Sequence, residues 1–178
     1  MDFTSLYKNK VVSAEQAVRQ IKSASRVYLG GGAGVPVQLM TALTQRAEEL
    51  RNVEIVHILT FADAPYTAPE LQASFRHNAL FIGGNARKAV SEGRADLTPI
   101  FLSEIPDLFR PGGTLPLDAA LISISPPDEH GFCSFGVEVG TTKPAAEEAQ
   151  IIIAEVNKQQ PRTLGDSFIH ISRLTSIV

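Results

Sequence analysis

Short runs of apolar residues recur along the chain, separated by segments in which apolar and polar positions follow a helical period. The runs are continuous rather than alternating, which is typical of strands in a parallel sheet that is covered on both faces. The most apolar run spans residues 151–156. We predict strands at residues 26–29, 53–59, 79–82, 118–124 and 151–156, with a further short strand at 168–171.

The intervening segments predict helices. Apolar residues three and four positions apart extend from Pro36 to Leu50, and proline suits the first turn of a helix. Ser13 is an expected N-cap, because Gln16 stands three residues later and completes a capping box. Ser103 is a second expected N-cap. Helices are therefore predicted at residues 13–24, 36–50, 85–92, 103–109 and 144–150.

Strands that alternate with helices predict an α/β fold, a mostly parallel sheet with helices on both faces. The length of 178 residues suits one domain over residues 1–178.

The net charge of −3 shows that the chain has no basic excess of the kind that nucleic-acid-binding proteins carry. No apolar stretch approaches the roughly 20 residues that span a bilayer. We therefore expect neither a nucleic acid nor a membrane as a partner. A single cysteine, Cys133, excludes a disulfide framework, and a cytoplasmic location is expected because no signal sequence stands near Met1.

The glycine cluster at residues 30–34 stands between a predicted strand and a predicted helix. The dinucleotide-binding pattern Gly-x-Gly-x-x-Gly fails, because its third glycine would fall on Val35 or Val37. A phosphate-binding Walker A loop fails as well, since the chain has no Gly-Lys pair. Two interpretations stay open. The cluster is a tight strand-to-helix turn, or it is a loop shaped to admit the backbone or acyl group of a ligand.

The second polar stretch, residues 123–136, follows a predicted strand, where ligands of open α/β sheets commonly bind. Ser134 is not in a Gly-x-Ser-x-Gly nucleophile elbow, because the nearest glycines lie three residues before it and two after it. Cys133, beside aromatic residues, is interpreted as a packing residue rather than a nucleophile. His130 lies near Asp128, but no histidine stands in a metal-ligand spacing, so no metal is expected.

Several short motifs, in a shared order and spacing, carry a resemblance that covers nearly the whole chain. With them, the chain resembles the N-terminal half of the acetyl-CoA hydrolase/transferase family, which includes 4-hydroxybutyrate CoA-transferase and belongs to the class I CoA-transferases. The motifs are residues 30–36, 81–96, 103–106, 118–122, 125–131 and 154–157.

The resemblance implies two similar α/β domains with an active site between them. Family members move CoA from an acyl-CoA to a small carboxylic acid, or to water in hydrolases. A glutamate attacks the thioester and carries CoA as a glutamyl-CoA thioester, which makes it a covalent nucleophile. Backbone N–H groups would hold the oxyanion. The resemblance implies CoA as a substrate and no bound metal or redox cofactor.

This chain departs from the family in length. Family members carry the catalytic glutamate and the CoA-binding loop in a C-terminal half, so we expect the catalytic residue beyond Val178 and assign it to neither Glu129 nor Glu138. The remaining half would shape the acyl side of the cleft. We predict that substrate is bound by residues of the glycine turn and of the second polar stretch: Gly31, Gly32, Gly34, Ser125, Pro126, Asp128, His130, Gly131, Ser134 and Gly136.

Three interpretations follow for the chain as a whole. It is the N-terminal half of a longer CoA-transferase, one subunit of a split CoA-transferase, or a stand-alone module that binds an acyl group or CoA. The first two predict no turnover by this chain alone, a missing half in cis or in trans, and a large apolar face where that half docks. We also expect a homo-oligomer. A serine or cysteine hydrolase that uses Ser134 or Cys133 is a remote alternative.

Overall fold

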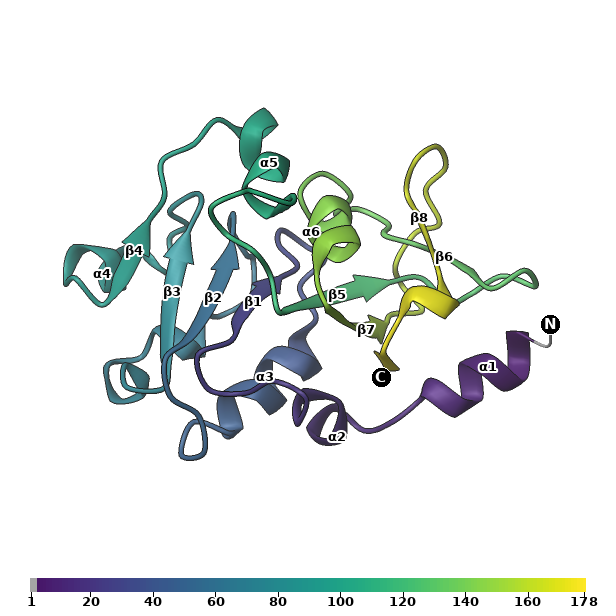
Figure 1. The fold of residues 1–178 in the computed structure, drawn as a ribbon, viewed down its shortest axis with the longest axis horizontal. Coiled ribbons are helices and arrows are strands. Elements are labelled where there is room, and N and C mark those ends of the chain that lie inside the picture. Colours follow the sequence, from purple (N-terminus) through teal and green to yellow (C-terminus); the bar gives the residue numbers. More distant parts are fainter. Residues whose placement is uncertain (1–2) are drawn as a thin grey trace.

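A seven-stranded parallel sheet forms the centre of the chain in a computed structural model that describes residues 3–178 (Figure 1). The strand order is β4-β3-β2-β1-β5-β7-β9, and every pairing between neighbours is parallel. This confirms the predicted fold class. The strands are β1 (Arg26–Leu29), β2 (Val53–His57), β3 (Phe75–Ala79), β4 (Ala95–Leu97), β5 (Ala119–Ile124), β7 (Ile151–Val156) and β9 (Ser176–Ile177).

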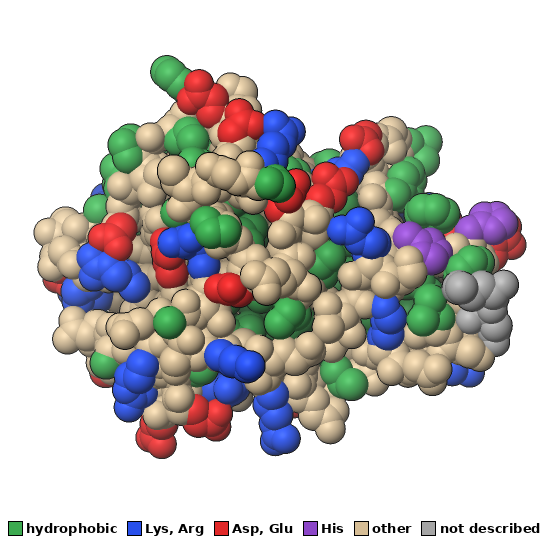
Figure 2. Space-filling model, viewed as in Figure 1, with side chains coloured by type: hydrophobic (Ala, Val, Ile, Leu, Met, Phe, Trp, Pro, Cys, Tyr) green, Lys and Arg blue, Asp and Glu red, His purple; other side chains and the backbone are tan. Residues whose placement is uncertain are grey.

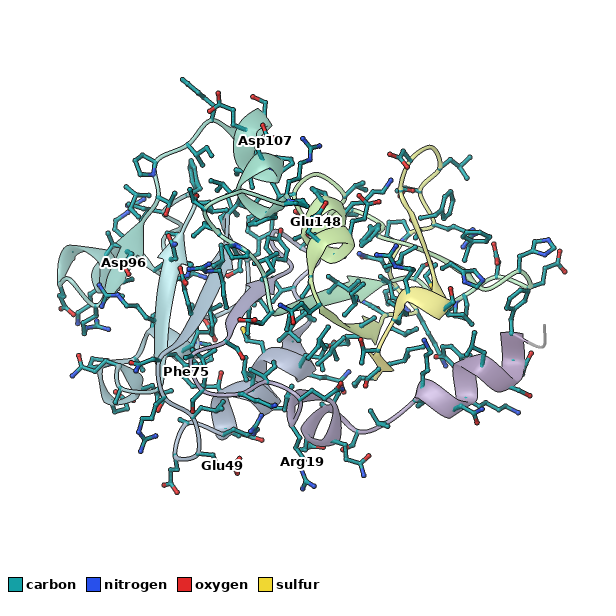
Figure 3. The ribbon with its side chains drawn as sticks, viewed as in Figure 1. Arg19, Glu49, Phe75, Asp96, Asp107 and Glu148 are labelled. Carbon is teal, nitrogen blue, oxygen red and sulfur yellow. The ribbon has the colours of Figure 1, made fainter. Side chains whose placement is uncertain are left out.

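The two faces of the sheet are both buried. Along β1, Val27 and Leu29 pack into one apolar cluster and Tyr28 packs into the other. The first cluster is covered by α2 (Ala14–Val18) and α3 (Val37–Gln45), and the second by α5 (Ile105–Phe109) and α6 (Thr142–Glu148). Figure 1 shows α2 and α3 below the sheet and α5 and α6 above it. Asp107 of α5 points away from the sheet and is exposed to solvent (Figure 3).

A second, smaller layer extends one end of the molecule. Here β6 (Phe132–Ser134) pairs antiparallel with β8 (Phe168–His170), beside α1 (Phe3–Lys10) (Figure 1). The Lys10 ammonium donates a 3.0 Å hydrogen bond to the Ile171 carbonyl, which ties the first helix to the last part of the chain. The remaining elements are α4 (Arg87–Ser91) and the 3₁₀ turns η1 (Pro65–Thr67), η2 (Pro69–Leu71), η3 (Leu102–Glu104) and η4 (Ile171–Arg173).

Of the two predicted helix N-caps, one is confirmed and the other is wrong. Ser13 is the N-cap of α2, and its capping box with Gln16 is confirmed by two reciprocal hydrogen bonds of 3.2 Å. The helix ends at Val18, well before residue 24. Ser103 as an N-cap is wrong, because η3 runs directly into α5 and makes Glu104 the N-cap, without a side-chain hydrogen bond.

The strand at 151–156 is confirmed as β7, but the strand expected at 79–82 is wrong. The observed β3 lies earlier and contains polar residues, which hide it from an apolar pattern. Asn78 donates a 2.8 Å hydrogen bond to Glu54 of β2, and Arg76 forms an ion pair with Asp96 of β4. These cross-strand partners satisfy the polar side chains within the sheet.

Candidate functional site

The glycine turn at residues 30–34 lies at the carboxyl end of β1, in the middle of the sheet. The backbone N–H of Gly30 donates to the Leu121 carbonyl at 2.8 Å, and that of Gly32 donates to the Leu59 carbonyl at 2.7 Å. Phe61 N–H donates to the Gly32 carbonyl at 3.1 Å. The turn is therefore held between the middle of β5 and the loop that follows β2.

Close packing explains why this turn is made of glycine. A Cβ atom at Gly31 would lie 2.7 Å from the Leu59 carbonyl oxygen, and one at Gly34 would lie 2.7 Å from Cβ of Glu138. Gly32 has a φ of +55°, in the left-handed region that glycine adopts without strain. The geometry supports the interpretation of a tight strand-to-helix turn.

The first turn of α3, directly after the glycines, is occupied by a side chain from β7. Glu155 Oε2 accepts the backbone N–H groups of Gln38 at 2.9 Å and Leu39 at 3.2 Å. Burial raises the pKa of this carboxyl, and the two backbone hydrogen bonds act in the opposite direction. Because the helix N-terminus already holds a carboxylate, its N–H groups are not free for the phosphate of a ligand.

Glu138 covers the other side of the glycine turn, a placement that sequence reasoning missed. Its Oε1 accepts a long hydrogen bond of 3.4 Å from the Thr142 hydroxyl, which also lies 3.0 Å from the Tyr28 hydroxyl. Within residues 3–178, no lysine, arginine or histidine forms an ion pair with this carboxylate. Burial raises the pKa of the Glu138 carboxyl above its ordinary value.

Apolar side chains surround two neighbouring hollows at this edge of the sheet. The first, of about 330 Å³, lies among the residues that follow β2, β3 and β4. The second, of about 370 Å³, lies between η3, α5 and residues 137–141, and shares Ile58 and Leu102 with the first. Large apolar side chains are exposed here, including Phe61 at 78% and Phe101 at 75%. Figure 2 shows hydrophobic side chains at the surface along this upper edge.

Two polar side chains fix the loop that borders the first hollow. Asn85 donates hydrogen bonds to the Thr60 hydroxyl at 2.8 Å and to the Ala62 carbonyl at 2.7 Å. At the base of the same loop, His57 Nε2 lies 2.5 Å from the Tyr66 hydroxyl. These bonds position the loop that carries Phe61 and the carbonyl partner of the glycine turn.

His57 and a second histidine form a buried pair beneath this loop. The His57 ring stacks on the His77 ring with centroids 4.1 Å apart. One nitrogen of each ring, His57 Nδ1 and His77 Nε2, has no hydrogen-bond partner among residues 3–178. Burial lowers the pKa of both imidazoles. Both rings are therefore neutral at physiological pH.

In the second polar stretch, residues 123–136, the predicted site residues form hydrogen bonds that hold the stretch in a hairpin. The Ser125 hydroxyl accepts the Ser134 N–H at 2.9 Å, and the fully buried Ser134 hydroxyl accepts the Gly136 N–H at 3.0 Å. Asp128 accepts the N–H groups of His130 at 2.9 Å and Phe132 at 2.8 Å, and pairs with Arg162. These side chains account for the shape of the stretch through bonds within the chain.

The structure does not bring all the predicted site residues to one hollow. Gly31, Gly32 and Gly34 form the turn beneath Glu138. Asp128 and Gly131 line a separate depression of about 310 Å³ with α1 and Ile171. Pro126 lies at the surface, as does His130, whose side chain is 73% exposed. A role for the second polar stretch in substrate binding stays a prediction.

Cys133 is fully buried, and burial raises the pKa of its thiol to about 12. The thiol is therefore protonated at neutral pH, and only the thiolate is a strong nucleophile.

Across residues 3–178, no three His, Cys, Asp or Glu side chains are grouped to hold a metal ion. In the same part of the chain, no helix has the length and apolarity needed to cross a membrane.

Comparison with known proteins places this geometry in a family. Residues 1–178 match the acetyl-CoA hydrolase/transferase N-terminal domain. The chain is 51% identical over all 178 residues to a 4-hydroxybutyrate coenzyme A transferase of Clostridium kluyveri, and 46% identical over 157 residues to a succinyl-CoA:acetate/propanoyl-CoA:succinate CoA transferase of Fasciola hepatica. These alignments cover 100% and 87% of this chain, but 41% and 32% of the relatives.

Solved structures agree with this placement. A 4-hydroxybutyrate CoA-transferase from Porphyromonas gingivalis aligns with a TM-score of 0.81 at 38% identity, over 99% of this chain and 40% of that protein. RipA from Yersinia pestis aligns with a TM-score of 0.89 at 27% identity, over 99% of this chain and 43% of that protein. The chain thus spans about two fifths of the length of these relatives. It belongs to the acetyl-CoA hydrolase/transferase family, as the N-terminal domain of that family.

Proposed function

We propose that residues 1–178 are the N-terminal half of an acyl-CoA:carboxylate CoA-transferase of the 4-hydroxybutyrate or acetate type. The observation that carries this proposal is the 51% identity to the Clostridium kluyveri transferase over every residue of the chain. That alignment covers only 41% of the relative, so the remainder of the enzyme is a second half, in cis or in trans.

The apolar edge of the sheet is the surface that this second half would cover. The two hollows at the edge are lined largely by aliphatic and aromatic side chains, which suit the hydrocarbon part of a short acyl group. Leu102, which is exposed, lines both hollows, and the exposed Phe101 lines a further hollow that shares Ile100 with the first. Exposed apolar side chains gathered in this way are typical of an interaction site. In this proposal the chain supplies the acyl side of a cleft that closes only when the second half docks.

The chemistry proposed for the complete enzyme needs a carboxylate from outside this chain. That carboxylate displaces the CoA thiolate from the acyl-CoA and forms an acyl-glutamyl anhydride. The thiolate then attacks the glutamyl carbonyl and releases the first acid, which leaves CoA on the glutamate as a thioester. A second acid takes the CoA by the reverse steps. Acyl-CoA and a small carboxylate are the substrates, and CoA is carried rather than permanently bound.

The test is an assay of the protein as its source organism makes it, with an intact-mass measurement on the same sample. We expect a mass above the 19.2 kDa of residues 1–178, or a tightly associated second chain, together with CoA transfer from butyryl-CoA to 4-hydroxybutyrate. A lone 19.2 kDa chain that binds acyl ligands without turnover would refute the transferase proposal and support the stand-alone binding module.

A further inference from the structure

The hollow between η3, α5 and residues 137–141 contains one ionisable side chain among the described residues that line it. Most of its lining is hydrocarbon, and Ser103 and Thr141 contribute neutral hydroxyls. Glu138 is the exception, a half-buried carboxyl set against the glycine turn. Polar groups in a mostly apolar site orient the ligand and determine specificity.

The hydrogen-bonding capacity of Glu138 is largely unused. A carboxylate can accept about four hydrogen bonds. Oε1 receives one long bond from Thr142, at 3.4 Å. Oε2 lies over Gly32, 3.0 Å from where a Cβ of that residue would stand, and no donor among residues 3–178 reaches it. A Cβ at Gly32 would crowd this oxygen.

The chemistry of the Glu138 carboxylate limits which ligands can bind beside it. An ionised carboxylate only accepts hydrogen bonds, so it repels the carboxylate of a second acid and favours a donor. An ammonium would be attracted to the carboxylate, but it would also lose its hydration in the apolar hollow, and that desolvation cost opposes the attraction. A hydroxyl donates one hydrogen bond and carries no charge to desolvate.

We propose that Glu138 selects acyl chains that carry a hydroxyl group, by accepting a hydrogen bond from that hydroxyl in the apolar hollow. The inference rests on the proposed function and names the substrate class of the same site. An unsubstituted chain would bury the carboxylate with no donor, and sites of this kind reject analogues that lack the hydroxyl. Glu138 is therefore a specificity-determining residue, separate from the nucleophile expected outside this chain.

The main test compares two substitutions at this position in the complete transferase. Glu138→Leu removes the acceptor at similar size, and Glu138→Gln keeps one acceptor oxygen. The readout is the ratio of kcat/KM for 4-hydroxybutyryl-CoA to that for butyryl-CoA. We expect the ratio to fall at least about tenfold in the leucine variant and less in the glutamine variant. The control is Glu70→Gln, an exposed carboxylate on η2, which should leave the ratio unchanged. An unchanged ratio in both Glu138 variants would overturn the inference.

A binding measurement separates this inference from the proposed function. Calorimetry compares 4-hydroxybutyrate, butyrate and 4-aminobutyrate as ligands of the wild-type protein and of Glu138→Leu, which has no acceptor oxygen at this position. Tighter binding of the hydroxy acid that is lost in the variant supports the inference even in a protein without CoA-transfer activity, where the proposed function alone would fail. Equal binding of the hydroxy acid and butyrate, or preference for the amine, would overturn it.

Discussion

Oε2 of Glu155, on β7, lies 2.9 Å from the backbone nitrogen of Gln38 in the first turn of α3. A buried carboxylate on one strand thus caps a helix that starts after another strand. The contact holds α3 against the sheet and fills the position at which many α/β proteins bind a phosphate.

We predict that Glu155→Ala lowers the free energy of unfolding by about 2–3 kcal/mol, because the buried N–H groups of Gln38 and Leu39 lose their acceptor. Glu155→Gln retains an acceptor oxygen and avoids burying a charge, so it should cost less than about 1 kcal/mol. Urea denaturation of both variants checks this. Equal losses in the two variants would show that the cap does not act through its acceptor oxygen.

The close contact beneath Glu138 gives a second prediction. Gly34→Ala places a Cβ 2.7 Å from that of Glu138, so we expect a loss of about 1–3 kcal/mol in unfolding free energy. Gly84→Ala is the matched control, because a Cβ there meets nothing within 4 Å, and it should change stability by less than about 0.5 kcal/mol. Thermal unfolding compares the two variants, and indistinguishable midpoints would contradict the packing described here.

The buried histidine pair predicts acid sensitivity. Because the pKa values of His57 and His77 are lower in the folded state than the ordinary 6.5, the unfolded chain binds more protons once the pH falls below about 6.5. The free energy of unfolding should then fall with decreasing pH, by up to about 1.4 kcal/mol per pH unit for each histidine. The measurement is urea denaturation between pH 7.5 and 5, above the range in which most carboxylates titrate.

A substitution tests whether the histidine pair causes this dependence of the unfolding free energy on pH. His77→Gln should reduce the pH dependence, whereas His130→Gln, at a side chain that is 73% exposed, should leave it unchanged. Because the buried carboxyls of Glu138 and Glu155 have raised pKa values and shift the stability in the opposite direction, the comparison of variants is decisive: an identical pH dependence in the wild-type protein and in His77→Gln would refute the role of the pair.

Cys133 supplies a fourth prediction. With its thiol buried and its pKa raised to about 12, the native protein should react with a thiol-specific reagent at pH 8 only on the timescale of unfolding. Addition of denaturant should make the reaction immediate. Cys133→Ala should leave CoA transfer by the complete enzyme intact, and a loss of transfer in a folded variant would revive a nucleophilic role.

Much of the fold was predictable because strand positions such as Ile151–Val156 are apolar on both faces, and because the Ser13 cap is a local interaction. The position of β3 was not predictable in this way, since Asn78 and Arg76 are stabilised by partners on neighbouring strands. Strands as short as Ser176–Ile177 carry too few residues for a periodic pattern.

The candidate site was predictable only in part. The glycine turn stands out in the sequence, but its contact with Glu138 joins residues about a hundred positions apart, and no local pattern encodes it. The role of Glu155 could not be predicted either. In the sequence it is one polar residue in an apolar strand, and only the folded structure brings its carboxylate to the start of α3.

We propose above that this chain forms the acyl side of a CoA-transferase whose nucleophile lies elsewhere. The most direct test incubates the protein from its source with acyl-CoA, digests it, and locates the covalent CoA adduct by peptide mass spectrometry. We predict an adduct on a glutamate outside residues 1–178. An adduct on any residue within 1–178, or CoA transfer without any adduct, would contradict the account.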